Sequence, residues 1–388
     1  MTAPPVPLLS GRLPALDGLR GLAALVVVVF HAMLVLPSIA NVVSGESRVG
    51  GWLATVTYTP LRLVWSGEEA VLVFFVLSGV VLTLPFRTRP FSAVTYYPRR
   101  LVRIYLPVWT SVALALLWSS LVPRVAVPGS SWWVNGHDFR LTPQGLGGDL
   151  TLLLGTTWLN SVLWSLRWEM WFSLLLPLYL LLLVRFRRWP LLKLVLLLGA
   201  TEAGALLHLD PLRYLPVFGV GVLLATELDR LGALLDRVGR LSGSVLLVLA
   251  VLVLTESRWL TGQTVSPVTV LAAAALVVLF ARWAPAVRLG AWRPVHWLGT
   301  VSFSLYLVHE PIVTSVALLL HTHNPAIVLL MALPASLLVA AGFYQVAERP
   351  SHHLSRWAGA LAARVVPLGR VEPTDQSRVL TRRAGTPT

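Results

Sequence analysis

The sequence predicts an all-α membrane protein with about ten transmembrane helices and both termini in the cytoplasm. Three observations lead to this fold class. The 388 residues are 56% hydrophobic and 12% charged, with a mean hydropathy of +0.75, a composition typical of polytopic membrane proteins. Apolar runs near the ~20 residues needed to cross a bilayer recur along the chain. Basic residues gather in alternate loops, as the positive-inside rule requires.

Ten apolar segments follow one another along the chain, and the seventh is the shortest. They cover residues 16–37, 68–86, 101–122, 164–184, 190–208, 212–227, 242–256, 265–281, 299–320 and 326–346. We therefore expect residues 1–348 to form a single membrane-embedded domain. Residues 349–388 read as a basic cytoplasmic tail that is disordered beyond an amphipathic turn near 354–366.

The loops after the even-numbered spans are much richer in basic residues than the others. They carry Arg87, Arg89, Arg99, Arg100, Arg103, Arg185, Arg187, Arg188, Lys193, Arg230, Arg237, Arg240, Arg282, Arg288 and Arg293. The loops after the odd-numbered spans carry Arg48, Arg62, Arg124, Arg140, Arg213 and Arg258. This bias puts both termini in the cytoplasm. It also puts His31 nearer the outer surface than Arg20.

The composition of the chain excludes several kinds of functional site. The chain has no cysteine, which excludes disulfides, thiolate metal sites and a cysteine nucleophile. The basic residues behind the net charge of +14 lie in short loops, where the positive-inside rule accounts for them. We therefore expect a lipid bilayer as partner and no nucleic acid. No spacing of ligands predicts a metal, and we expect no bound cofactor.

The first span contains Asp17, Arg20 and His31, although a cation within a bilayer is costly. Arg20 and His31 are 11 residues apart, close to three turns at ~3.6 residues per turn, so they share a helix face. Asp17 lies on that face too. Gly18 and Gly21 would let another backbone or a ligand approach. Alternatively, Arg20 snorkels to the interface and His31 is a hydrogen-bonded interior histidine.

The second and third spans offer two further candidates. Ser78 and Gly79 lie mid-span, a pattern that favours close helix packing over a catalytic serine. At the start of the third span, Arg100 and Arg103 share a helix face at the cytoplasmic interface. Guanidinium groups at a helix start suit phosphate groups, and anchoring to the interface explains them equally well.

The fourth span contains Glu169, and an intramembrane carboxylate is a functional candidate by default. Counted from the outer ends of their spans, Glu169 and His31 lie at depths that match within ~2 Å at 1.5 Å per residue. The sequence thus predicts His31 as a general base with Glu169 as its orienting partner.

The fifth to eighth spans carry no assignable site residue, although Glu202 is a lone intramembrane carboxylate. The ninth span places Tyr306 and His309 in mid-membrane, followed by Glu310 and Pro311, which should free backbone carbonyl groups. The tenth span ends at Glu348, which could pair with arginines at the cytoplasmic edge. Asp17, Ser78, Tyr306, His309 and Glu348 are therefore candidates for acceptor binding or support of the site.

Five stretches, in this order, resemble the acyltransferase-3 family of integral membrane acyltransferases over about residues 13–350. LDGLRGLAALVVVVFH carries its arginine and histidine, and FFVLSG its Phe-Phe-x-x-Ser-Gly element, with valine following where phenylalanine is usual. RRLVRIYLP carries its Arg-x-x-Arg element. WSLRWEMWFSLLLPL carries its glutamate, with serine where tyrosine is common and tryptophan for a small residue. SLYLVHEP carries its Tyr-Leu-x-His element.

The resemblance implies transfer of an acyl group, often acetyl, from cytoplasmic acyl-CoA to a hydroxyl of a sugar, polysaccharide, glycolipid or antibiotic-like acceptor. On this reading Arg20, Arg100 and Arg103 bind the CoA phosphates. His31 removes the acceptor proton, and Glu169 supports its imidazole. We expect a multi-pass protein of a bacterial plasma or inner membrane. Some family members carry a fused SGNH domain, for which this chain is too short.

Two other classes of function remain open. A proton-coupled secondary transporter or a flippase for a lipid-linked sugar also uses intramembrane histidine, glutamate and arginine. The sequence lacks the paired inverted repeats and matching broken helices that such transporters usually show. A structural membrane protein would leave the buried charges unexplained.

Overall fold

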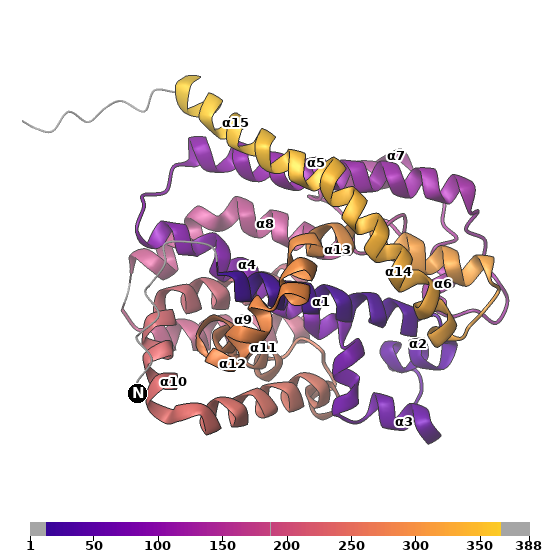
Figure 1. Cartoon of the computed structure of the whole chain (residues 1–388), viewed down its shortest axis with the longest axis horizontal. Helices are drawn as coiled ribbons and strands as arrows, with labels where there is room; N and C mark the ends of the chain where they lie inside the picture. Colours follow the sequence, from indigo (N-terminus) through magenta and orange to yellow (C-terminus); the bar gives the residue numbers. More distant parts are fainter. Residues whose placement is uncertain (1–12, 187, 366–388) are drawn as a thin grey trace, which may run out of the picture.

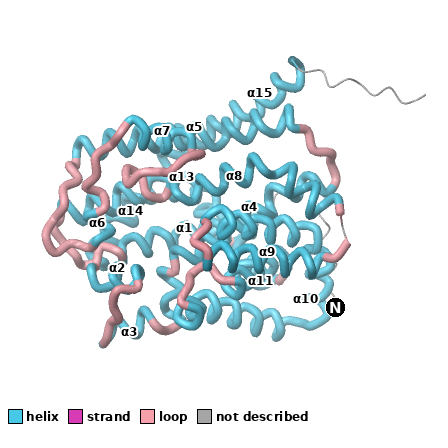
Figure 2. Tube along the Cα trace, turned by 180° about the vertical axis from the view of Figure 1, so that it is seen from behind, coloured by secondary structure: helices cyan, strands magenta, loops and turns pink. Residues whose placement is uncertain are grey.

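The computed structural model describes residues 13–186 and 188–365, and all regular structure within them is helical (Figure 2). The longer helices are α1 (Pro14–Met33), α4 (Gly67–Thr83), α5 (Ala93–Leu121), α8 (Leu163–Tyr179), α9 (Pro190–Leu206), α10 (Asp210–Thr261), α11 (Pro267–Arg282), α13 (Arg293–Leu319), α14 (Pro325–Phe343) and α15 (Arg349–Val365). The shorter segments are α2 (Pro37–Ser44), α3 (Gly51–Thr57), η1 (Pro60–Trp65), η2 (Leu84–Arg87), α6 (Trp132–Asn135), α7 (Pro143–Thr151), η3 (Leu180–Arg185), α12 (Ala284–Ala291) and η4 (Tyr344–Glu348).

The chain is an all-α polytopic membrane protein, as predicted. By length and composition, seven helices in the described residues can cross a membrane. An eighth candidate is the pair α11 and α12, which meet at an angle of 80°. Every predicted span falls on a helix, and the count of ten stays a prediction. The side on which the termini lie stays a prediction.

Two of the ten predicted spans are not among these candidates. The span predicted at 190–208 corresponds to α9, which has only 17 residues, fewer than the ~20 that cross a bilayer. The spans predicted at 212–227 and 242–256 both belong to α10, which turns sharply at Gly239. The φ of +79° at this residue is a conformation that glycine adopts readily. The second half of α10 is one of the seven candidates, although its apolar run is the shortest in the sequence.

Helices α1, α4 and α13 form the interior of the bundle. In the most apolar stretch of α13, 83% of the residues are buried, against 28% in the second half of α10 and in α14–α15. Those outer helices expose leucine and valine side chains such as Leu241, Val248, Leu330 and Leu338. An apolar surface of this kind suits contact with lipid. The polar side chains of α1 and α13 are therefore shielded from lipid by other helices.

Glycines bring the interior helices into direct backbone contact with one another and with α10 and α12. A Cβ atom on Gly18 would overlap the backbone of Gly290, and one on Gly21 would overlap the backbone of Gly299. In the same way Gly79 on α4 lies against the backbone of α10 at Gly221. The close-packing interpretation of the Ser78–Gly79 pair is therefore confirmed for the glycine.

The segment from 122 to 162, which connects α5 to α8, folds back along the bundle. The indole Nε1 of Trp109, near the middle of α5, donates to Leu150 O at 2.9 Å. Trp171 on α8 donates to Leu153 O at 3.2 Å, and Trp132 of the segment donates to Ala40 O at 2.9 Å. We call residues 122–162 the outer loop. With α2, α3 and α6 it lies at one end of the molecule (Figure 1).

At the opposite end, α15 continues α14 and lies alongside α5 (Figure 1). Gly359 of α15 allows this approach, because a Cβ there would overlap the side chain of Arg99. The helix covers Arg349–Val365, so the amphipathic turn expected near 354–366 is part of a longer helix that begins directly after η4. The rest of the predicted tail, 366–388, lies outside the described residues.

Candidate active site

A cavity of about 350 Å³ lies between α1, α4, α8, α13 and the outer loop. Four tryptophans and several hydroxyl groups contribute to its wall. The lining residues are Val27, Phe30, His31, Leu34, Val43, Gly67, Glu68, Val71, Trp132, Trp133, Thr156, Thr157, Trp158, Ser161, Trp164 and Tyr306. Its volume is within the range of small-molecule sites, ~300–1,000 Å³.

His31 lies in the wall of this cavity beside a second histidine. Its Nδ1 lies 3.0 Å from Val27 O and 3.0 Å from Nε2 of His309. The Nδ1 of His309 lies 2.9 Å from Leu305 O. Carbonyl oxygens only accept hydrogen bonds, so both histidines carry their proton on Nδ1. Nε2 of His31 is then an unprotonated acceptor, and it makes no hydrogen bond with any described residue.

Tyr306 extends the polar group formed by His31 and His309 toward α8. Its hydroxyl lies 2.6 Å from Oγ of Ser165, and its ring packs edge-on against Phe74 with the centroids 5.6 Å apart. The centroids of its ring and the His309 ring are 5.9 Å apart. The structure thus brings together three predicted site residues: His31, Tyr306 and His309.

The outer loop contributes His137 and Ser161, two residues that the sequence analysis did not select. His137 Nε2 contacts Oε1 of Glu310, and both side chains are fully buried. The Nδ1 of His137 lies 2.8 Å from Trp133 O, and Oγ of Ser161 donates to Glu310 Oε1 at 3.3 Å. Glu310 was noted in mid-span, and its need for a partner was the available signal. Its partner is 173 residues away in sequence, in a segment that lies between two predicted spans.

Pro311 provides the second attachment of the outer loop. Proline has no N–H, so it leaves Leu307 O, one turn earlier, without its helical partner. Nδ2 of Asn160 donates to this oxygen at 2.8 Å. The freed carbonyl predicted from the sequence is therefore present, and the outer loop satisfies it.

Glu169 pairs with Arg100 and makes no hydrogen bond with His31. Its Oε1 lies 2.5 Å from Nη2 of Arg100, whose Nε donates to Oγ of Ser173 at 2.9 Å. The predicted Glu169–His31 pair rested on matching depths in straight spans with common boundaries. Helix α5 instead begins at Ala93, about two turns before the predicted span. Its basic first half therefore runs beside α8 and reaches the carboxylate.

Arg20, Arg103 and Glu348 form a second cluster. The carboxylate of Glu348 accepts from the backbone N of Ser304 at 3.2 Å and from its Oγ at 2.6 Å. Arg20 and Arg103 both act on it electrostatically, which supports the predicted pairing of Glu348 with arginines. Arg100 and Arg103 share a helix but turn to different partners.

Two predicted candidates remain outside these contacts. Asp17 lies where α1 crosses α13, with its backbone against Gly299. Ser78 is buried one turn beyond Phe74 on α4. The roles of both residues stay predictions.

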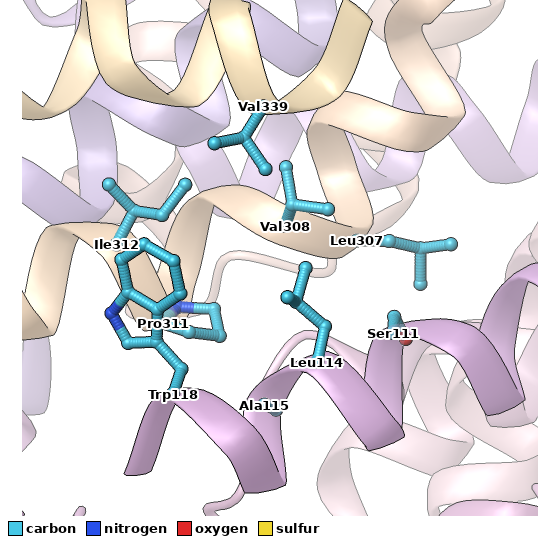
Figure 3. A pocket seen from close by; sticks show the side chains of 9 residues that line it. All are labelled: Ser111, Leu114, Ala115, Trp118, Leu307, Val308, Pro311, Ile312 and Val339. Atoms are coloured by element: carbon cyan, nitrogen blue, oxygen red, sulfur yellow. The ribbon is translucent and has the colours of Figure 1, made fainter. Parts of the chain in front are cut away.

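A smaller apolar gap lies behind Pro311, between α5, α13 and α14 (Figure 3). Its volume of about 10 Å³ is near the space that one water needs. Side chains of Leu114, Trp118, Val308 and Ile312 face it in the close-up. With this lining it offers no reacting groups, so the candidate site is the larger cavity.

Comparisons with known proteins identify the family of this chain. The family model described as an acyltransferase domain, of the acyltransferase-3 family, matches residues 13–345. The acyltransferase MdmB of Streptomyces mycarofaciens is 32% identical over 169 residues, which are 43% of this chain. The matched stretch spans 39% of that relative's length. No solved structure matches. The extent of the family match shows that this membrane protein belongs to the acyltransferase-3 family.

Proposed function

We propose that the protein transfers an acyl group, most simply acetyl, from acyl-CoA to a hydroxyl group of a sugar, polysaccharide, glycolipid or antibiotic-like acceptor. The observation that carries this proposal is the state of His31. Its Nε2 is an unprotonated acceptor in the wall of a cavity large enough for a small molecule. A histidine in this state can act as a general base.

The reaction needs two proton transfers, the first to His31 and the second from it. Nε2 of His31 takes the proton of the acceptor hydroxyl as its oxygen attacks the thioester carbonyl carbon. The C–S bond then breaks, and the thiolate of CoA takes the proton back from Nε2. During the step His31 is an imidazolium, and Nδ1–H donates to Nε2 of His309 or to Val27 O. The neighbouring histidine therefore supports the charged form of the base.

The donor would approach from the end that carries the arginines. Arg20, Arg100 and Arg103 lie on α1 and α5, and arginine binds phosphate groups through paired hydrogen bonds. Ser165, Glu169 and Ser173 are four residues apart on α8 and form a polar row between Tyr306 and Arg100. The long pantetheine arm of CoA could follow this row toward His31. The loop bias places this end in the cytoplasm, where acyl-CoA is found.

The cavity wall suits a hydroxylated acceptor. Trp132, Trp133, Trp158 and Trp164 offer flat apolar surfaces to the C–H face of a sugar-like ring. Thr156, Thr157, Ser161 and Glu68 add hydroxyl and carboxylate groups within the same wall. Glu68 is itself held by Arg258 of α10 and by Thr264, which donates to its Oε2 at 3.0 Å.

Release of the CoA thiol gives a direct assay, because a chain without cysteine adds no protein thiol to the signal. The purified protein in liposomes would receive acetyl-CoA and a panel of alkyl glycosides. His31→Gln should lower kcat by ~10²–10⁴-fold, the usual contribution of a general base. Binding of CoA should persist. His323→Gln, in the loop between α13 and α14, is the matched control and should behave as wild type.

Two results would contradict the proposal. One is acetyl transfer by His31→Gln at a rate close to wild type. The other is transport of the acceptor by the wild-type protein without any thiol release.

A further inference from the structure

The contact between His137 and Glu310 contains a proton. Nδ1 of His137 faces the carbonyl oxygen of Trp133 and therefore carries hydrogen. Nε2 of the same ring faces a carboxylate oxygen, and two acceptors do not form a contact without a proton between them. The pair is sealed from solvent, with both side chains at 0% exposure. It joins the outer loop to the turn of α13 that also carries His309.

We propose that Glu310, held by His137, is a positioning residue for the base. Its carboxylate stabilises the imidazolium of His31 during acyl transfer, and its contact with His137 holds the outer loop over the cavity. The inference rests on the proposed acyl transfer. It adds roles for Glu310 and His137 and an opening movement of the outer loop.

The electrostatic arrangement supports the first role. The titratable groups that act on His31 are His309 and Glu310 of α13 and His137 of the outer loop. Of the last two, Glu310 acts more strongly on His31 than His137 does. Between Glu310 and His137 the balance therefore favours a positive charge on His31, even when His137 is protonated, and it offsets in part the opposing influence of His309. The interior position strengthens such interactions relative to water.

The Glu310 carboxylate can also accept a further hydrogen bond. Its Oε1 receives His137 and Ser161, whereas its Oε2 is buried without a hydrogen-bond partner among the described residues. Arg124 of the outer loop adds a further charge that acts on Glu310. Its guanidinium is held by Trp158 O at 3.2 Å and Leu159 O at 2.9 Å. Burial lowers the pKa of this arginine, and the charge of Glu310 opposes that shift.

The second role follows from what His137 connects. Through the carbonyl oxygen of Trp133 it fixes the segment whose indole lies against the His31 ring, with the centroids 5.3 Å apart. Asn160, bound to Leu307 O, holds the other end of the same loop. Three tryptophans of the cavity wall, Trp132, Trp133 and Trp158, lie between these two attachments or beside them. Loss of His137 should therefore open the acceptor side of the cavity.

The two roles respond differently to substitution. Glu310→Gln removes the charge but keeps a hydrogen bond, since the amide can donate to Nε2 of neutral His137. We expect kcat to fall by roughly 10- to 100-fold, the size of effect that a nearby opposite charge produces. The KM values for acetyl-CoA and for the glycoside acceptor should change by less than about twofold. Glu202→Gln on α9 is the matched control and should be unchanged.

His137→Ala removes the attachment itself. A reporter cysteine at the buried Val134, placed in the otherwise cysteine-free chain, measures opening of the loop with a small maleimide. Labelling should be at least about tenfold faster in His137→Ala than in the reporter alone, as expected for loss of a charge-assisted bond. The acceptor KM should rise together with it. Glu310→Gln and the control His323→Ala should label as slowly as the reporter alone.

The inference is overturned if Glu310→Gln has the kcat of wild type, or if His137→Ala labels no faster than its control. Failure of the proposed function looks different, because His31→Gln would then remain active whatever the result at Glu310.

Discussion

The three arginines at the proposed donor end differ in how far their charge is already neutralised. Arg100 is bound by Glu169 and Ser173, with only 12% of its side chain exposed. Arg20 makes no hydrogen bond or ion pair with a described residue and feels Glu348 only through space. Arg20 therefore has more capacity for an incoming phosphate group than Arg100 has.

Arg20→Ala should raise the KM for acetyl-CoA more than Arg100→Ala does. A hydrogen bond to a charged group is worth about 1.5–3 kcal/mol, so we expect a rise of roughly 10- to 100-fold for Arg20. Arg20→Lys should recover only part of it, because lysine cannot bind in a bidentate manner. Steady-state kinetics with acetyl-CoA as the varied substrate gives the comparison. Equal or reversed effects would show that Arg100 is the principal ligand.

Glu169→Gln separates two roles for this carboxylate. If Glu169 mainly neutralises Arg100, the substitution frees the guanidinium, and the KM for acetyl-CoA should fall severalfold with kcat little changed. If Glu169 supports the base, as the sequence suggested, kcat should fall instead. The split between KM and kcat in the thiol-release assay decides between them. We expect the change in KM, because the structure pairs Glu169 with Arg100.

At the scale of helices, Pro311 and Asn160 form a coupled pair across the outer loop and α13. Asn160→Ala leaves Leu307 O without a partner and should destabilise the protein by about 1–3 kcal/mol. In the Pro311→Ala background the alanine N–H can bond Leu307 O within the helix. Asn160→Ala should then cost clearly less, a coupling that a double-mutant cycle measures from thermal unfolding in detergent. Additive effects would mean that the proline and the amide act independently.

The crossing of α4 and α10 should be intolerant of side chains. Gly79→Val would place atoms where the backbone of α10 lies, and overpacking of this kind typically costs about 1–3 kcal/mol. We expect a lower midpoint of thermal unfolding in detergent. Gly342→Ala on α14 is the matched control, since nothing lies within 4 Å of a Cβ built there. An unchanged midpoint for Gly79→Val would show that the two helices can separate without loss.

At the scale of the whole molecule, the topology remains to be measured. Single cysteines at Ser47 and Ala126, on exposed positions of the outer end, should label from outside intact cells. Cysteines at Thr88 and Ala363, exposed at the other end, should label only after permeabilisation. Labelling of Ala126 and Ala363 from the same side would disprove the arrangement inferred from the arginine bias.

The sequence predicts the helices well, because apolar length and loop charge are local properties. It also selects His31, Tyr306 and His309, since a polar side chain within an apolar span is visible without neighbours. It does not foresee the pairing of Glu169 with Arg100, because depth alone does not tell which helices are adjacent. It passes over His137 because a histidine in a polar segment has no periodic signal, and only tertiary packing brings that segment into the bundle. The sharp turn at Gly239 likewise depends on one φ angle.

The two attachments of the outer loop also set an order of events during synthesis. His137 and Asn160 are made 173 and 147 residues before Glu310 and Leu307, their partners on α13. While the ribosome is still translating the middle of the chain, His137 and Asn160 have no partners on α13, and the cavity lacks the part of its wall that Tyr306 supplies. The cavity can close only after α13 has been inserted beside α1. A nascent chain stopped before that helix would therefore present an open, chaperone-accessible loop, and the last third of the protein acts as the closing step of its own biogenesis.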